Sequence, residues 1–180
     1  MSTPLRTRAA RLGAATALAA ALAATLPAAP AAAEENSPQI ALLNVASGKC
    51  LEIADWRTDD GAPGRQWTCT GYANQKWHWT DAGQLVNVNS GRCLEIPKAS
   101  TVWGVQVEQR TCNGNPEQRW SDANRLPDGT RLIVNLNSGL LLDLAGGSAA
   151  NGARVVQWAW NGGNNQKWSY DTLPWTGPHS

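Results

Sequence analysis

Two pairs of residues in this chain combine a carboxylate with an indole fifteen positions further on: Glu52 with Trp67, and Asp143 with Trp158. A carboxylate can accept hydrogen bonds from two neighbouring hydroxyls. An indole offers a flat apolar surface that can cover the carbon face of a sugar ring. Side by side, the two groups form a chemically sensible sugar site. From the spacing alone, the tryptophans could equally be core residues, and the carboxylates could be solvated or turn-forming.

The chain contains a threefold internal repeat that would position these pairs. In each copy a Ser-Gly pair precedes a Gln-x-Trp motif by the same interval, and a glycine and a glutamine stand at fixed places between them. The serines are Ser47, Ser90 and Ser138, and the motifs are Gln75-Lys76-Trp77, Gln118-Arg119-Trp120 and Gln166-Lys167-Trp168. A regular repeat of about 20 to 50 residues is typical of folds built from like structural units.

The four cysteines occupy matching positions in the first two repeats. The interval from Cys50 to Cys69 equals that from Cys93 to Cys112. Four cysteines allow three pairings, and the repeat favours one disulfide within each of these two repeats. A zinc site is a rival interpretation, although no Cys-x-x-Cys spacing or histidine cluster is present. Repeat three has Leu141 and Trp160 at these positions, for which we expect an apolar contact.

This pairing predicts which side chains face one another. If each cysteine pair is opposed on two antiparallel strands, Glu52 faces Trp67, and the carboxylate lies on the disulfide's side of the sheet. The same register pairs Asp143 with Trp158. It also sets Glu95 against Arg110, which predicts a salt bridge.

Short apolar runs bounded by turn residues predict an all-β chain. They include 40–45, 85–88 and 132–136, flanked by Ser-Gly, Asp-Gly or Asn-Gly signals. No segment after position 33 has a convincing helical pattern. Three repeats of four short strands can close into one barrel-like body around a shared core. We expect Trp77, Trp120 and Trp168, one from each repeat, in that core.

With these motifs in register, the chain resembles the ricin B-chain-type β-trefoil family. The resemblance extends from about Ile40 to Tyr170. It rests on the three Gln-x-Trp motifs together with Cys50-Leu51-Glu52, Cys93-Leu94-Glu95 and Leu141-Leu142-Asp143. It implies a β-trefoil of three homologous repeats with pseudo-threefold symmetry, at about 40–80, 81–125 and 126–170.

The resemblance also implies a set of sugar-binding residues in each repeat: an Asp after Cys-Leu, an aromatic platform and an Asn-Gln pair. Repeat three matches fully, with Asp143, Trp158, Asn165 and Gln166. Repeat one has Glu52, Trp67, Asn74 and Gln75. Its Glu in place of Asp adds one methylene, so we expect an altered site there, secondary to that of repeat three. In repeat two, Arg110 and Glu117 replace the aromatic residue and the Asn, so we expect that pocket to be lost.

Positions 1–33 have the pattern of a secretory signal peptide. Three arginines precede an apolar stretch that is short for a membrane span, and Ala31-Ala32-Ala33 precedes Glu34. We therefore expect cleavage after Ala33, a linker over 34–39 and a C-terminal tail over 171–180. Without the three signal arginines, 12 basic residues stand against 14 acidic ones, a net charge of −2.

These features predict a secreted, extracellular carbohydrate-binding protein without catalytic activity, which recognises galactose-like or related pentose sugars on glycans or polysaccharides. The small negative charge gives no reason to expect a nucleic-acid partner, and we expect no cofactor, no metal and no membrane span in the mature protein. Two alternatives remain: a trefoil that binds protein, such as a secreted inhibitor, and an enzyme. The repeat leaves little of the chain for a catalytic domain.

Overall fold

The structure is a computed structural model that describes residues 38–172. Its twelve strands fall into three groups of four, in agreement with the predicted repeats. The first group is β1 (Ile40–Asn44), β2 (Cys50–Ile53), β3 (Ala62–Trp67) and β4 (Trp77–Trp79); the second is β5 (Leu85–Asn87), β6 (Cys93–Glu95), β7 (Glu108–Arg110) and β8 (Trp120–Arg125); the third is β9 (Arg131–Asn135), β10 (Leu141–Leu144), β11 (Val155–Trp158) and β12 (Trp168–Thr172). The described chain has no α-helix.

Each repeat also contains two short 3-10 turns at equivalent places, one after its second strand and one before its fourth. They are η1 (Ala54–Trp56), η2 (Ala73–Gln75), η3 (Pro97–Ala99), η4 (Pro116–Gln118), η5 (Ala145–Gly147) and η6 (Asn164–Gln166). The second turn in each repeat ends on the Gln of Gln-x-Trp. The motif therefore marks the point where the chain leaves the surface and enters a strand of the core.

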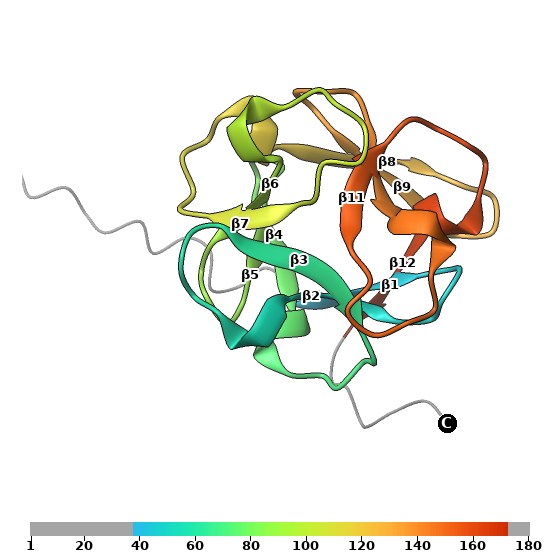
Figure 1. Cartoon of the computed structure of the whole chain (residues 1–180), viewed down its shortest axis with the longest axis horizontal. Helices are drawn as coiled ribbons and strands as arrows, with labels where there is room; N and C mark the ends of the chain where they lie inside the picture. Colours follow the sequence, from blue (N-terminus) through green and yellow to red (C-terminus); the bar gives the residue numbers. More distant parts are fainter. Residues whose placement is uncertain (1–37, 173–180) are drawn as a thin grey trace, which may run out of the picture. The chain divides into compact units, whose positions relative to one another are not determined.

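All strand pairings in the described chain are antiparallel, and the first and last strands close the sheet. β1 pairs with β12 along its whole length, from Ile40 opposite Thr172 to Asn44 opposite Trp168. β3 pairs with β7, which joins repeats one and two. Figure 1 shows the three groups of strands arranged around a shared centre, with β1 beside β12. These pairings confirm the predicted β-trefoil.

The three repeat tryptophans form the centre of the core, as predicted. Trp77, Trp120 and Trp168 are 0 %, 2 % and 0 % exposed. Each indole N–H donates to the backbone carbonyl oxygen of the leucine in its own repeat's second strand, at distances of 3.2, 2.9 and 3.0 Å. Each buried polar atom of these rings is thus satisfied, which removes the main cost of burying tryptophan.

A buried glutamine in each repeat fastens one repeat to the next. The side-chain oxygen of Gln157 accepts from the Ser138 hydroxyl at 2.7 Å, and its amide donates to the carbonyl oxygens of Ser100 and Val102 in repeat two, both at 2.9 Å. Gln66 and Gln109 make equivalent bonds in their repeats. The repeated interval from serine to glutamine therefore has a structural cause.

Both predicted disulfides are confirmed: Cys50 joins Cys69, and Cys93 joins Cys112, each with 5.1 Å between Cα atoms. In repeat three, an apolar contact between Leu141 and Trp160 was expected in place of a disulfide, but the two side chains differ in burial. Leu141 is buried, but Trp160 is 55 % exposed, so most of its ring faces solvent.

The predicted register between the paired strands was wrong by two positions. Glu52 lies opposite Arg65, not Trp67, and Cys50 lies opposite Trp67. Asp143 likewise lies opposite Val156. The reason is that the second cysteine of each disulfide follows the end of its strand, so the two cysteines are not opposed. A shift of two preserves the face of the strand, so the indoles still lie on the side of the carboxylates.

Several predicted segments lie outside the described residues: the signal peptide (1–33), most of the linker (34–39) and most of the tail (171–180). β12 extends past the expected end of the domain, to Thr172. Within 38–172 there is no helix long and apolar enough to cross a membrane.

Candidate functional site

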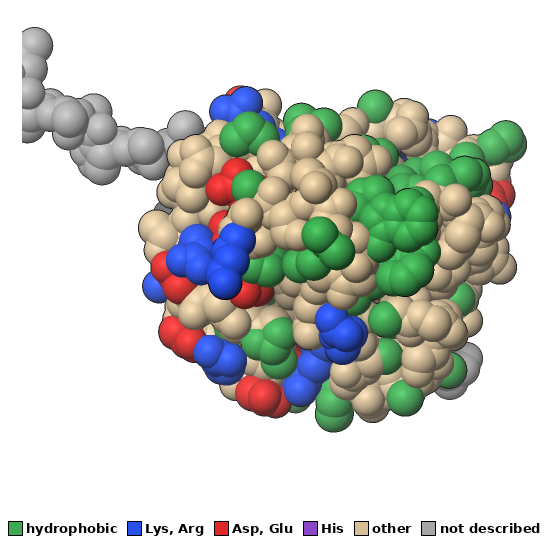
Figure 2. Space-filling model, turned by 45° about the horizontal axis from the view of Figure 1, so that its top comes forward, with side chains coloured by type: hydrophobic (Ala, Val, Ile, Leu, Met, Phe, Trp, Pro, Cys, Tyr) green, Lys and Arg blue, Asp and Glu red, His purple; other side chains and the backbone are tan. Residues whose placement is uncertain are grey.

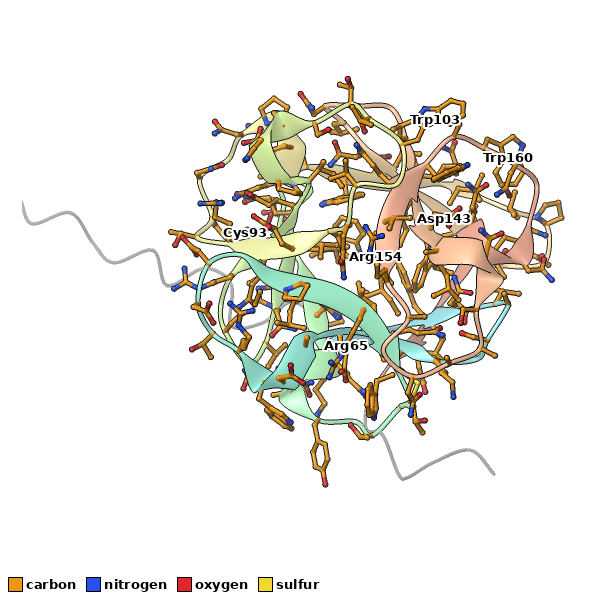
Figure 3. All side chains as sticks on the ribbon, in the orientation of Figure 1. Arg65, Cys93, Trp103, Asp143, Arg154 and Trp160 are labelled. Carbon is orange, nitrogen blue, oxygen red and sulfur yellow. A yellow bond between two sulfur atoms is a disulfide. The ribbon has the colours of Figure 1, made fainter. Side chains whose placement is uncertain are left out.

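Repeat three carries a pocket of about 500 Å³ on its outer surface. Asp143 reaches it from β10, Trp158 from the end of β11, and Asn165 from η6, while η5 supplies Gly146 and Gly147. The structure thus brings together three of the four residues predicted for this repeat. Figure 3 shows Asp143 on the repeat-three strands, with Arg154 labelled nearby.

Asp143 and Arg154 are the charged residues that line this pocket, and within the described chain no ion pair neutralises Asp143. Its Oδ2 accepts a hydrogen bond from Asn165 Nδ2 at 2.9 Å. The residue is 2 % exposed, and burial raises the pKa of the Asp143 carboxyl, an effect that amide hydrogen bonds partly offset. A partly desolvated carboxylate retains acceptor positions for hydroxyl groups.

Trp158 forms one wall of the pocket and is 39 % exposed. Its ring is braced by the neighbouring repeat: a Cβ atom placed on Gly104 would lie 3.1 Å from Trp158 Cζ3. Gly104 has φ +79°, a conformation that favours glycine. The absence of a side chain therefore lets the repeat-two loop approach the indole closely and hold it in place.

Gln166 does not line the pocket, although it belongs to the predicted set. Its side chain is fully buried. Its Oε1 accepts from the backbone N–H of Asn161 at 2.8 Å, and its Nε2 donates to the carbonyl oxygen of Ala159 at 2.7 Å. Gln75 is buried in the same way and bonds Thr70 N–H and the Thr68 carbonyl. Both glutamines position the loop that follows the third strand.

Repeat one has a smaller pocket, of about 280 Å³, and Arg65 is one of the residues that line it. The Arg65 side chain contacts both groups that were expected to bind a sugar, Glu52 and Trp67. Arg65 Nε lies 2.9 Å from Glu52 Oε1, and its guanidinium lies 4.6 Å from the centroid of the Trp67 ring. Glu52 Oε2 accepts from Gln75 Nε2 at 2.9 Å and from Asn74 Nδ2 at 3.3 Å. Protein groups therefore engage both carboxylate oxygens and a face of the indole.

Sequence reasoning missed Arg65 because it placed Trp67 opposite Glu52. The repeat held the necessary signal, since the residue two positions before the platform is Arg65, Glu108 or Val156 in the three repeats. A valine at that place leaves Asp143 without an ion pair, whereas an arginine neutralises Glu52.

Repeat two contains the predicted salt bridge. Arg110 Nε lies 2.8 Å from Glu95 Oε1, and Gln118 Nε2 donates to Glu95 Oε2 at 2.8 Å. Glu108, opposite Glu95 on β7, also lies 3.3 Å from Arg110. Both carboxylate oxygens of Glu95 therefore accept hydrogen bonds from protein groups.

Three like repeats around a shared core, with one open carboxylate–indole pocket, define a β-trefoil of lectin type. A sequence model of the family described as ricin-type beta-trefoil lectin domain-like matches residues 30–84, 73–158 and 123–174. The chain belongs to this family, and membership supports carbohydrate binding.

Solved structures agree with this assignment. The chain is 35 % identical to ThreeFoil, a designed threefold-symmetric protein, with a TM-score of 0.73, over 75 % of this chain and 99 % of that one. It is 32 % identical to an exo-β-1,3-galactanase from Clostridium thermocellum, with a TM-score of 0.71, over 77 % of this chain but only 31 % of the galactanase. The C-half of an earthworm R-type lectin in complex with GalNAc shares the fold at 20 % identity and a TM-score of 0.63, over 76 % of this chain and 99 % of that one.

Proposed function

We propose that this chain is a secreted carbohydrate-binding protein that takes a galactose-like or related sugar in the pocket of repeat three. The observation that carries the proposal is a carboxylate without an ion pair, Asp143, in one pocket with the partly exposed Trp158 and with Asn165. The carboxylate would accept hydrogen bonds from sugar hydroxyls, and the indole would cover the apolar face of the ring. GalNAc in the earthworm lectin and galactan as the substrate of the galactanase support a galactose-like ligand.

We propose binding without catalysis. The chain spans about a third of the galactanase, so the activity of that protein is not carried over. The trefoil extends over nearly all of the described residues, and its pocket holds one carboxylate rather than the two that glycoside hydrolases generally use. Two disulfides and a lectin-type domain are consistent with the extracellular location that the predicted signal peptide implies.

Affinity chromatography on immobilised galactose, followed by a glycan and polysaccharide array, tests this function. The mature protein is expected to be retained on the column and eluted by free sugar. A trefoil that binds only protein, such as an inhibitor, would pass through the column and give no signal on the array. That result would contradict the proposal.

Sugar affinity is expected to fall in mild acid. Burial raises the pKa of Asp143 above its ordinary value of 3.8, so the carboxyl becomes protonated at a higher pH than an exposed Asp. Protonation removes the charge and part of the acceptor capacity. Sugar affinity should therefore be highest at neutral pH. As the pH is lowered, the affinity should begin to decline while the pH is still above 3.8.

Calorimetric titration with galactose from about pH 7.5 to about pH 3 measures this decline, with circular dichroism at each pH to confirm folding. The raised pKa means that the fold disfavours the ionised form, so protonation of Asp143 should not itself unfold the domain. An affinity that stays constant over this range in the folded protein would show that the Asp143 charge does not bind the sugar.

The residue opposite the pocket carboxylate is expected to decide whether a repeat binds sugar. An arginine placed there in repeat three should block its pocket, and a valine placed there in repeat one should help to open the other. Val156→Arg should place a guanidinium beside Asp143 and Trp158, as Arg65 lies beside Glu52 and Trp67, and should lower affinity at least about tenfold, the loss of one hydrogen bond to a charged group. The double variant Arg65→Val/Glu52→Asp should open the repeat-one pocket and raise the calorimetric stoichiometry from one toward two. Parent-like binding by folded Val156→Arg would contradict this account.

A further inference from the structure

The three contacts between repeats are not alike in their side chains. At the first, Asp60 Oδ1 in repeat one accepts from the backbone N–H of Thr111 at 2.7 Å and from its hydroxyl at 3.1 Å. At another, Asn151 Oδ1 in repeat three accepts from the N–H and hydroxyl of Thr68, at 3.0 and 3.1 Å. In both, a short polar side chain satisfies the backbone just past the end of the neighbouring repeat's third strand.

The contact between repeats two and three lacks this arrangement. The positions equivalent to the acceptor and the threonine hold Trp103 and Ala159. The backbone contact remains, because Gly104 N–H donates to the Gln157 carbonyl at 2.8 Å, as Gly61 and Gly152 do to Gln109 and Gln66. An indole offers no acceptor oxygen and alanine no hydroxyl. Trp103 therefore does not have the structural role that Asp60 and Asn151 have at the other two contacts.

Trp103 lies beside the repeat-three pocket. Its ring centroid is 5.8 Å from that of Trp158, with 49° between the ring planes. It is 57 % exposed, and Figure 3 shows it on the repeat-two loop next to the third repeat. Figure 2 brings this side of the domain forward and shows a broad hydrophobic patch. Exposed tryptophans that adjoin a pocket are typical of binding surfaces rather than of solvated loops.

The loop that carries Trp103 is fixed on both sides. The carbonyl oxygen of Val102 accepts from Gln157 Nε2 at 2.9 Å, and that of Gly104 accepts from Arg154 Nη2 at 3.0 Å. Arg154 Nε also donates to Gln106 Oε1 at 3.0 Å. Because the backbone is held before and after residue 103, little further ordering of the loop would be needed when a ligand contacts the indole.

We propose that Trp103 is a second sugar-stacking platform, so that the junction of repeats two and three binds a neutral oligosaccharide chain of at least two sugar units. One unit occupies the Asp143 pocket against Trp158, and the adjacent unit lies against Trp103. This inference rests on the proposed function and adds its substrate class, an oligosaccharide or polysaccharide chain rather than a single terminal sugar.

The test compares monosaccharides with trimers by calorimetry, using galactose, xylose, β-1,3-linked galactotriose and β-1,4-linked xylotriose. The parent should bind one of the trimers more tightly than its monosaccharide. Trp103→Ala should lower affinity for that trimer roughly three- to tenfold, the effect of one aromatic contact, and leave monosaccharide affinity unchanged within about twofold.

A double variant, Trp103→Asn/Ala159→Thr, guards against a loss caused by misfolding. It installs at this junction the Asn–Thr pair that Asn151 and Thr68 form at another, so the domain should fold while the platform is absent, and trimer affinity should fall as in Trp103→Ala. Val102→Ala, an exposed neighbour on the same loop, is the control expected to bind as the parent.

The outcomes separate this inference from the proposed function. If the parent binds none of the four sugars, the proposed function fails and the inference fails with it. If the parent binds a monosaccharide or a trimer, the proposed function stands. The inference is then overturned by equal affinity for trimer and monosaccharide, or by parent-like trimer binding in either Trp103 variant.

Discussion

Replacement of Asp143 by alanine is expected to abolish sugar binding while the domain stays folded. The carboxylate would accept two hydrogen bonds from sugar hydroxyls, and each bond to a charged group contributes about 1.5–3 kcal/mol. Their loss corresponds to a decrease in affinity of at least about a hundredfold. Calorimetric titration with galactose measures the decrease directly.

Stability should change little in this variant, for a reason visible in the site. Burial disfavours the charged form of Asp143, as its raised pKa shows, and no cation within the described residues loses an ion-pair partner when the carboxylate is removed. Asn165 loses the hydrogen bond that it donates to Asp143 but is partly exposed and can be solvated, so the melting temperature of Asp143→Ala is expected to fall by only a few degrees. Binding and folding can be measured separately at this position.

Glu95→Ala is the matched control, because Glu95 has the same place in repeat two. Its carboxylate is bound by Arg110 and Gln118, and Arg110 is 45 % exposed, so the arginine can be solvated when the pair is broken. This variant should bind galactose as the parent does. If Glu95→Ala abolished binding in a folded protein, or Asp143→Ala bound like the parent, repeat three would not be the principal site.

The contrast between repeats one and three shows what the sequence could predict and where it fell short. Spacing and the family resemblance together brought Asp143, Trp158 and Asn165 into one predicted site, and the structure places all three around one pocket. They did not reveal Arg65 as the partner of Glu52, because the assumption that the cysteines are directly opposed set the wrong register. A disulfide constrains the distance between two Cα atoms but not whether they are directly opposite, so a shift of two positions is compatible with it.

The fold was more predictable than the site because three copies of one pattern constrain it. A glycine, a glutamine or a tryptophan at one position says little, but the same residue in three repeats indicates a shared structural role. Trp103 illustrates the converse. It breaks the threefold pattern at a position that is polar in the other repeats, and only the structure shows that the break lies beside Trp158. A departure from an internal repeat marks a position whose role differs between repeats, and the structure around it then indicates whether a site is lost, as at Arg110, or extended, as we propose at Trp103.

Trp168→Ala is expected to produce a large loss of stability in the domain. The indole is fully buried in the shared core, and truncation of a buried tryptophan typically costs about 3–5 kcal/mol. It also leaves the Leu142 carbonyl without the indole N–H that lies 3.0 Å away. In a domain of this size the melting temperature should fall by roughly 10–20 °C.

Trp160→Ala provides the matched control in the same repeat. Trp160 is 55 % exposed, against 0 % for Trp168, so its truncation creates no internal cavity and should lower the melting temperature by no more than a few degrees.

The threefold symmetry of the core leads to a further prediction. Trp77 and Trp120 are buried in equivalent places and bond equivalent leucine carbonyls, so their alanine variants should be destabilised by similar amounts. Thermal unfolding followed by circular dichroism measures all four variants, and similar melting temperatures for Trp168→Ala and Trp160→Ala would contradict the assignment of the repeat tryptophans to a common core.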